Sequence, residues 1–292
     1  MLSTARYQMY PILKKLWDTS FGDGEAYTNF LLDKIPPEQI LVWLDGKTIA
    51  AMLCWLPFEM KSSNGNVSAV YMFGFNVHPR FRGKGIGTKL LEGFHQYIFG
   101  KGYRAACLAP ADMDLFDYYD KRGYELLFSV KSAVVSAADI PKSENNRCVL
   151  VPRPLNSLYA ERERFFGGEG MFASWGKNTL DLFGSECRFR KGQTLKVSCC
   201  GKGGYVALLP VGNGKIRINE LAVPPEIMCD VLHALNIRLG VSEFELRLRA
   251  DERVPFVATV LPFVMVKWYD REKQIDIFKE LDRLPYFAHI LD

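Results

Sequence analysis

The stretch Val77-His78-Pro79-Arg80-Phe81-Arg82-Gly83-Lys84-Gly85-Ile86-Gly87-Thr88-Lys89-Leu90-Leu91 decides the fold of this chain. The apolar run before it, residues 70–77, predicts a strand, and the apolar positions after Thr88 have helical spacing. The loop between them combines three glycines with basic residues. Glycines let a ligand approach the backbone closely, and the first amides of a helix have no partner within the helix. We therefore expect the loop to bind an anionic phosphate group, aided by the helix dipole.

Two nucleotide-binding loops are alternatives to this interpretation. A dinucleotide-binding turn has Gly-x-Gly-x-x-Gly directly at the end of its strand. Here the five residues from His78 to Arg82 intervene, and the third glycine comes one place early. A P-loop has Gly-Lys followed by Ser or Thr, whereas Gly87-Thr88-Lys89 has the wrong order. These differences disfavour NAD and ATP sites, and a glycine-rich connection that holds nothing is the third alternative.

The segment resembles the acyl-CoA-binding core of the GCN5-related N-acetyltransferases, whose signature is Arg/Gln-x-x-Gly-x-Gly/Ala. Here the signature reads Arg82-Gly83-Lys84-Gly85-Ile86-Gly87, between an expected strand and an expected helix. The resemblance covers roughly residues 1–140. It implies an α/β fold with a mixed sheet, acetyl-CoA as co-substrate and transfer of an acetyl group to a primary amine. The alternative is a non-catalytic acyl-CoA-binding or interaction protein of the same fold.

The resemblance also implies which residues bind the co-substrate. In the family, the strand before the glycine loop splays from its parallel neighbour, and its backbone pairs with the pantetheine arm. That backbone here belongs to Phe75, Asn76 and Val77. The pyrophosphate would be held chiefly by main-chain N–H groups, and the residues concerned are Arg82, Gly83, Lys84, Gly85, Ile86, Gly87 and Thr88.

A second family motif is an aromatic–Tyr pair before a Gly-aromatic turn, here Tyr118-Tyr119-Asp120-Lys121-Arg122-Gly123-Tyr124. Tyr119 occupies the position of the family's usual general acid, which would protonate the leaving CoA thiolate. The alternative is that Tyr119 is a packing residue. Family members often place a Glu on the strand before the glycine loop, but residues 71–75 contain no carboxylate, so the general base stays open.

The acceptor amine has fewer signals in the sequence. Asp23 and Glu25 are candidates for acceptor binding, and the apolar tail at 286–292 would bring a terminal carboxylate into the site, as in related two-domain enzymes. Five aromatic residues on the expected lining segments favour a flat or apolar acceptor: Trp43, Trp55, Phe58, Tyr71 and Phe73. The sequence has no acidic run that would bind a polycationic acceptor.

Composition limits the class of protein. The 292 residues are 48% hydrophobic and 24% charged, which is typical of a packed globular chain. The net charge of +4 is too small to indicate nucleic-acid binding. No apolar run predicts a membrane span and residues 1–6 lack a signal-peptide pattern, so we expect a cytoplasmic protein. Seven cysteines without Cys-x-x-Cys predict reduced packing residues and no metal site.

The pattern of apolar and turn residues predicts alternating helices and strands. Expected helices cover residues 7–18, 26–32, the segment after Thr88, 112–122 and 225–239. Expected strands cover residues 39–44, 48–57, 70–77, 104–109, 124–130, 196–210 with a central turn, 215–224, 243–248 and 256–268.

The second half repeats the strand and helix pattern of the first. Residues 196–210 parallel the hairpin at 39–57, and residues 215–224 parallel the strand before the glycine loop. The glycine loop itself is missing, because Pro224 passes directly into Pro225. We therefore predict an acetyltransferase domain at 1–145 and a degenerate copy at 146–292. A lipid-carrier-like second domain is the alternative, and the aromatic-rich second half offers a surface for a homodimer.

Overall fold

The computed structural model describes residues 1–141, 148–167, 170–278, 281, 283–289 and 291. Its helices are α1 (Tyr10–Phe21), α2 (Glu25–Leu32), α3 (Ile86–Gly100), α4 (Met113–Asp120), α5 (Tyr159–Phe166), α6 (Lys177–Phe189), α7 (Met228–Leu239) and α8 (Arg271–Ile277). Its strands are β1 (Leu2–Thr4), β2 (Ile40–Asp45), β3 (Thr48–Ser62), β4 (Gly65–Val77), β5 (Ala105–Leu108), β6 (Glu125–Ser136), β7 (Cys148–Pro152), β8 (Phe172–Trp175), β9 (Gln193–Cys199), β10 (Lys202–Gly212), β11 (Lys215–Ala222), β12 (Glu243–Arg249) and β13 (Thr259–Trp268).

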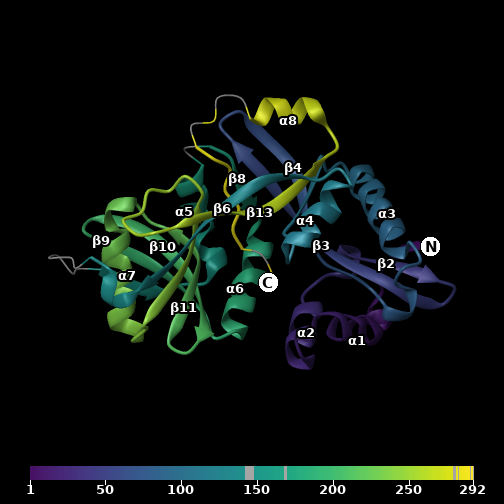
Figure 1. The fold of residues 1–292 in the computed structure, drawn as a ribbon, viewed down its shortest axis with the longest axis horizontal. Coiled ribbons are helices and arrows are strands. Elements are labelled where there is room, and N and C mark those ends of the chain that lie inside the picture. The colour runs from purple at the N-terminus through teal and green to yellow at the C-terminus, as the bar shows by residue number, and fades with distance from the viewer. Residues whose placement is uncertain (142–147, 168–169, 279–280, 282, 290, 292) are drawn as a thin grey trace.

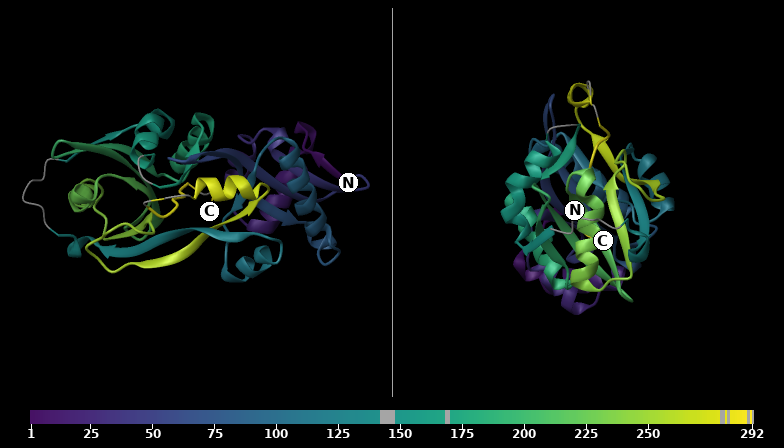
Figure 2. Two further views of the ribbon diagram at one scale, coloured as in Figure 1. Left: turned by 90° about the horizontal axis from the view of Figure 1, so that it is seen from above. Right: turned by 90° about the vertical axis from the view of Figure 1, so that its left-hand side faces the viewer.

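A single mixed sheet runs through both halves of the molecule (Figure 1). The strand order is β1-β2-β3-β4-β5-β13-β6-β12-β11-β10-β9-β7, and β8 pairs with β3 off this path. Each half contains one parallel pair, β4 with β5 and β11 with β12. The order from one edge therefore mirrors the order from the other, with β13 and β6 at the centre. Figure 2 shows the two halves at opposite ends of the long axis.

The two halves exchange a strand at this centre. Strand β13 lies between β5 and β6 and is antiparallel to both, with Met265 opposite Leu108 and Val264 opposite Phe128. Strand β6 pairs on its other edge with β12 of the second half. Each half thus completes the sheet of the other. This order is the one that a second copy of the same fold would produce, and the choice between a degenerate copy and the lipid-carrier-like alternative stays a prediction. The predicted boundary between residues 145 and 146 lies outside the described residues and stays a prediction.

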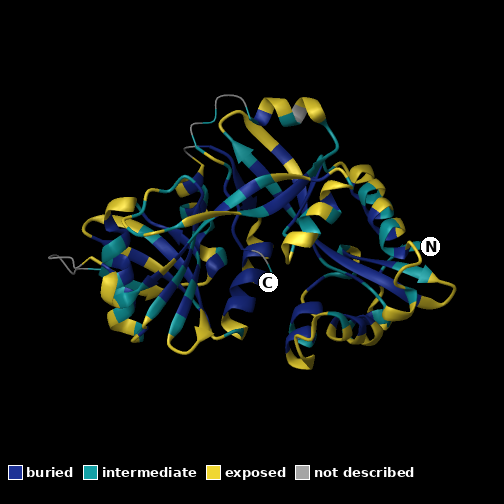
Figure 3. Cartoon of the chain, in the orientation of Figure 1, coloured by how far each residue is buried: buried dark blue, intermediate teal, exposed yellow. Residues whose placement is uncertain are grey.

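Helices cover the sheet on both faces, which explains why β3 and β4 are buried along most of their length (Figure 3). Helix α3 packs its apolar stripe, including Leu90 and Phe94, on one face of the first half. Helices α1 and α2 cover the opposite face, in a core that continues to α6 and the C-terminal tail. Helix α7 closes a separate core in the second half.

Local signals placed most of these elements correctly. Asp112 caps α4 by accepting a hydrogen bond from the Leu115 N–H at 3.0 Å, and Gly123 after the helix has a φ of 78°. The Asp45-Gly46 hairpin joins β2 to β3 as predicted, with Gly46 at a φ of 59°. No sequence prediction covers β1, β7, β8, α5, α6 or α8.

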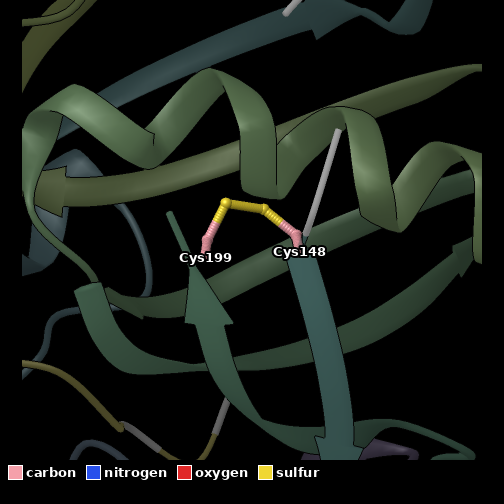
Figure 4. The surroundings of a disulfide bond; sticks show 2 residues. All are labelled: Cys148 and Cys199. Carbon is pink, nitrogen blue, oxygen red and sulfur yellow. A yellow bond between two sulfur atoms is a disulfide. The ribbon is translucent and has the colours of Figure 1, made fainter. Parts of the chain in front are cut away.

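The prediction that all cysteines are reduced is wrong for one pair. Cys148 and Cys199 form a disulfide between β7 and β9 (Figure 4). The two residues lie directly opposite each other in the antiparallel pairing of these strands, although they are 51 positions apart in sequence. Spacing along the chain could not reveal the pair, because only the pairing of the strands brings the side chains together.

Replacing Cys148 by Ser is expected to lower the free energy of unfolding of the oxidised protein by about 2–4 kcal/mol, because the disulfide closes a long loop in the unfolded chain. The measurement is denaturant unfolding without a reducing agent. Cys200→Ser is the matched control, because Cys200 is exposed and belongs to no disulfide. Equal stability of wild type and Cys148→Ser under oxidising conditions would contradict the expectation.

A buried polar network joins the C-terminal tail to the second half. Glu220 on β11 and Arg162 on α5 are fully buried, and Arg162 Nη2 lies 3.1 Å from Glu220 Oε1. His289 Nε2 lies 2.7 Å from Glu220 Oε2, to which the hydroxyl of Tyr205 also donates. Burial alone would raise the pKa of Glu220, but Arg162 and His289 outweigh it and hold the pKa well below its ordinary value.

Replacing Glu220 by Gln should lower the free energy of unfolding at pH 7 by about 3–5 kcal/mol, because Arg162 is left as an unpaired buried charge. Because folding lowers the pKa of Glu220, its contribution is present above the unfolded value of about 4.3 and is lost as the pH falls below it. As the pH falls from about 5 to about 3, a range that spans the unfolded pKa, the free energy of unfolding should therefore decrease more steeply for the wild type than for the variant.

Denaturant unfolding at several pH values tests this expectation. Glu226→Gln is the control, because Glu226 forms an exposed ion pair with Lys202 at 2.8 Å. A loss of stability in Glu220→Gln no larger than in this control would show that the buried network does not stabilise the fold.

Candidate functional site

Strands β4 and β5 diverge at the centre of the first half. Their parallel pairing covers only residues 69–71 of β4 and 105–107 of β5. Gly74 then bends β4 with a φ of 61°, and a Cβ there would lie 2.2 Å from the ring of Trp17. Beyond this bend, Asn76 and Val77 still pair with β3 on one edge. Among the described residues, no strand pairs with the edge of residues 75–77 that faces β5.

The glycine loop lies at the open end of this divergence. Gly83 and Gly85 both have a φ of 73°, and a Cβ on either would have no heavy atom within 4 Å. Their left-handed backbone is the reason for glycine at these positions. Gly87 has a different role, because a Cβ there would lie 3.3 Å from the side chains of Phe75 and Val77. Gly87 thus allows α3 to pack closely against the end of β4.

Six consecutive main-chain amides of the loop are available to a ligand. The first hydrogen bond of α3 runs from the Lys89 N–H to the Gly85 oxygen at 3.1 Å. Within the described chain, the N–H groups of residues 83–88 have no protein acceptor. The side chain of Arg82 instead donates from Nε to the Val77 oxygen at 3.0 Å and fixes the loop to β4. The structure therefore brings together all the residues predicted for co-substrate binding, with Arg82 as a support.

The predicted general acid lies behind the loop. Tyr119 is 7% exposed in the core under α3, with its ring centroid 5.1 Å from that of Tyr118 and 5.5 Å from that of Tyr124. Burial raises the pKa of its hydroxyl above the ordinary value. No described residue forms a hydrogen bond with this hydroxyl, whose oxygen is not fully buried. The hydroxyl of Tyr118 is closer to the loop, at 3.9 Å from a Cβ built on Gly87.

A cavity of about 530 Å³ opens on the α1 and α2 side of β4. Asp23 lines it and accepts a hydrogen bond from Trp17 Nε1 at 2.8 Å, whereas Glu25 lies in a separate groove between α1 and α2. Tyr71 and Phe73 also line the cavity, as predicted.

Three of the five aromatic residues predicted for the acceptor pocket pack elsewhere. Trp55 contacts Tyr97 and Tyr103 in the core under α3, with which Trp43 also packs. Phe58 packs against Trp175 in the core between the halves. These three residues lie on β2 and β3, but their side chains pack in the hydrophobic cores and do not line the cavity.

The second half supplies cavity residues that the sequence did not reveal. These are Arg190 after α6, Arg247 on β12, Pro262 and Phe263 on β13, and Leu291 in the tail. Arg190 stacks on the ring of Tyr27 at 4.6 Å and forms an ion pair with Glu186. Arg247 lies 5.7 Å from the ring centroid of Phe263. No local pattern indicates these residues, because only the packing of segments far apart in the chain brings them to the cavity.

The C-terminal tail is held between the halves before it reaches the cavity. Tyr286 pairs with residues 171–173, and Trp175 Nε1 donates to the Ala288 oxygen at 2.9 Å. Leu291 then lines the cavity. Asp292, whose terminal carboxylate the sequence offered as a site group, lies outside the described residues.

Comparison with known proteins agrees with this architecture. Residues 3–127 match the family model described as an acetyltransferase (GNAT) domain. A search of curated proteins finds no match. Within the described residues, no helix is long and apolar enough to cross a membrane.

Solved structures resemble the chain over both halves. A GCN5-related N-acetyltransferase from Anabaena variabilis is 16% identical, with a TM-score of 0.74 over 93% of this chain and 73% of that one. Eis1 from Mycobacterium abscessus is 14% identical, with a TM-score of 0.70 over 94% and 75%. A tandem GNAT protein from the clavulanic acid biosynthesis pathway is 10% identical, with a TM-score of 0.53 over 92% and 99%. At such identities the similarity shows the fold alone.

Replacing Gly85 by Val should weaken acetyl-CoA binding about 10–100-fold, because the side chain covers the open amides and each lost charge-assisted hydrogen bond costs about 1.5–3 kcal/mol. Isothermal titration measures the affinity. Gly46→Val is the matched control, because Gly46 has a similar φ of 59° and open space around it, but lies in the hairpin between β2 and β3. Equal affinities of the two variants would exclude the loop as the phosphate site.

Proposed function

We propose that this chain, whose residues 3–127 match the acetyltransferase (GNAT) domain model, transfers an acetyl group from acetyl-CoA to a primary amine. One observation carries the proposal: the N–H groups of residues 83–88, which have no acceptor in the described part of the chain, lie beside the edge of residues 75–77 that no described strand pairs. Amides at a helix N-terminus bind phosphate, and a free strand edge binds an extended amide chain. Coenzyme A contains both groups in sequence, a pyrophosphate followed by the pantetheine arm.

The reaction would proceed by direct attack of the amine on the thioester carbonyl. The neutral amine nitrogen forms the new C–N bond, and the tetrahedral intermediate then breaks its C–S bond. The amine loses one proton, and the departing CoA thiolate takes one from a general acid. Tyr119 would be this acid, because its position in the chain matches the family's and burial keeps its hydroxyl protonated at neutral pH.

The cavity beside β4 would hold the acceptor. Aromatic rings from both halves line it, which suits a flat or apolar body. Its described charged residues are Asp23, Arg190 and Arg247, so a polycationic acceptor would meet two arginines and a single carboxylate. We therefore expect an amine with an apolar or aromatic body. A cytoplasmic location and a homodimer remain predictions from the sequence.

A non-catalytic acyl-CoA-binding protein is the second candidate. It is favoured by the lack of a carboxylate in residues 71–75 of β4, where family members often have a Glu. Titration with acetyl-CoA, NAD and ATP is the first test, followed by an amine screen with release of free CoA as the signal. Binding of acetyl-CoA alone with turnover supports the enzyme. Binding without turnover across many amines supports the second candidate, and no binding of acetyl-CoA refutes both.

Replacing Tyr119 by Phe should lower kcat about 10²–10⁴-fold, the usual contribution of a general acid, and leave acetyl-CoA affinity unchanged. Because burial raises the pKa of Tyr119 above the ordinary value of about 10, the wild-type rate should not fall on the alkaline side below that pH.

Tyr118→Phe is the comparison variant, because its ring is edge-on to that of Tyr119 and its hydroxyl is nearer the glycine loop. The readouts are the pH profile of kcat and the acetyl-CoA dissociation constant of each variant. A large loss of kcat in Tyr118→Phe with none in Tyr119→Phe would transfer the role to Tyr118.

A further inference from the structure

Four potential metal ligands converge at the outer edge of the second half, away from the candidate site. The sulfur atoms of Cys199 and Cys200 and a carboxylate oxygen of Asp230 all lie within 4.8 Å of one another. Cys148 joins the group through its disulfide to Cys199 (Figure 4). The sequence predicted no metal site, because these residues come from three distant segments and form no Cys-x-x-Cys.

The fold explains how three segments meet here. Strand β7 places Cys148 opposite Cys199, the last residue of β9. Cys200 begins the turn to β10 with a φ of 51° and is exposed to solvent. Asp230 lies in the first turn of α7, which passes next to the disulfide. Regular secondary structure therefore holds Cys148, Cys199 and Asp230, while Cys200 stands at the surface where an ion would enter.

The ligand types and their spacing suit one class of metal. Zinc binds thiolates at about 2.3 Å and carboxylate oxygens at about 2.0–2.2 Å in a tetrahedron, so its ligand atoms lie roughly 3.5–4 Å apart. Three sulfurs and one oxygen complete such a shell once the disulfide is open. Hard cations such as Mg²⁺ and Ca²⁺ prefer oxygen ligands only. The donor set thus favours Zn²⁺ over either of them.

We propose that the reduced chain binds one Zn²⁺ through Cys148, Cys199, Cys200 and Asp230, and that the Cys148–Cys199 disulfide is the oxidised, metal-free form. A dithiol reductant such as dithiothreitol gives two electrons and two protons to the disulfide and becomes a cyclic disulfide itself. The disulfide yields two thiols. Zinc then displaces the protons of three thiols as the three Zn–S bonds form. In the reverse direction, a disulfide oxidant such as oxidised glutathione accepts the two electrons and becomes two thiols, while the sulfurs of Cys148 and Cys199 bond to each other again. The ion then loses two of its four ligands and is released.

The test compares zinc binding by the reduced and the oxidised full chain. Each form, freed of excess reductant, competes for Zn²⁺ against a chromophoric chelator, and bound metal is counted by elemental analysis. The reduced wild type should bind one Zn²⁺ per chain at least about 100-fold more tightly than the oxidised form, because two of four ligands are lost on oxidation. Cobalt substitution should show thiolate-to-metal charge-transfer absorption in the reduced protein only.

Variants separate this site from adventitious binding. Cys200→Ser and Asp230→Asn keep the disulfide, so they should fold as the wild type does. Each should weaken zinc binding by at least about 10–100-fold, because that is the usual cost of altering a residue that only supports a ligand, and these variants alter the ligands themselves. Cys187→Ser is the matched control, because Cys187 is buried on α6 outside the cluster and should leave binding unchanged. Reduced protein that binds no zinc, or binds it equally well in Cys200→Ser and Asp230→Asn, would overturn the proposal.

Discussion

The insertion of β13 between β5 and β6 is the constraint on which the rest of the structure depends. It makes one continuous sheet out of two halves, because β6 then pairs with β12 on its far edge. It also directs the chain end: after β13 and α8 the tail returns between the halves, where Trp175 and Glu220 hold it. The cavity beside β4 is therefore lined by residues of both halves, although the glycine loop belongs to the first half.

The second half contains a strand divergence that resembles the one at the candidate site. Strands β11 and β12 also pair only at one end, over residues 215–218 and 243–246, and then diverge. Where β4 exposes a free edge beside a glycine loop, β11 carries Glu220, whose carboxylate is saturated by Arg162, Tyr205 and His289. Pro224 and Pro225 lead straight into α7 without open glycines. Beyond the paired residues, β11 therefore carries a buried carboxylate whose partners are the protein's own polar side chains.

The sequence predicts what local physics determines. Residues close together in the chain determine the glycine loop, the Asp112 cap and the alternation of strands and helices. The structure confirms these elements. The exchange of β13, the disulfide and the cavity arginines Arg190 and Arg247 do not follow, because each depends on pairing between segments far apart. The apolar pattern of a strand determines which of its faces is buried, but it does not determine which strands pair with it.

On the proposed function, the two substrates would be recognised by different parts of the molecule. If residues 75–77 and 83–88 bind the co-substrate common to the family, then they carry no information about the acceptor. The cavity beside β4, which would hold the acceptor, is lined by segments of both halves that lie far apart in the chain, from α1 to the C-terminal tail. The described arginines of the cavity come only from the second half. On the proposed function, the second half would contribute no phosphate loop; it would instead help to shape the acceptor cavity and hold the tail near it through Glu220.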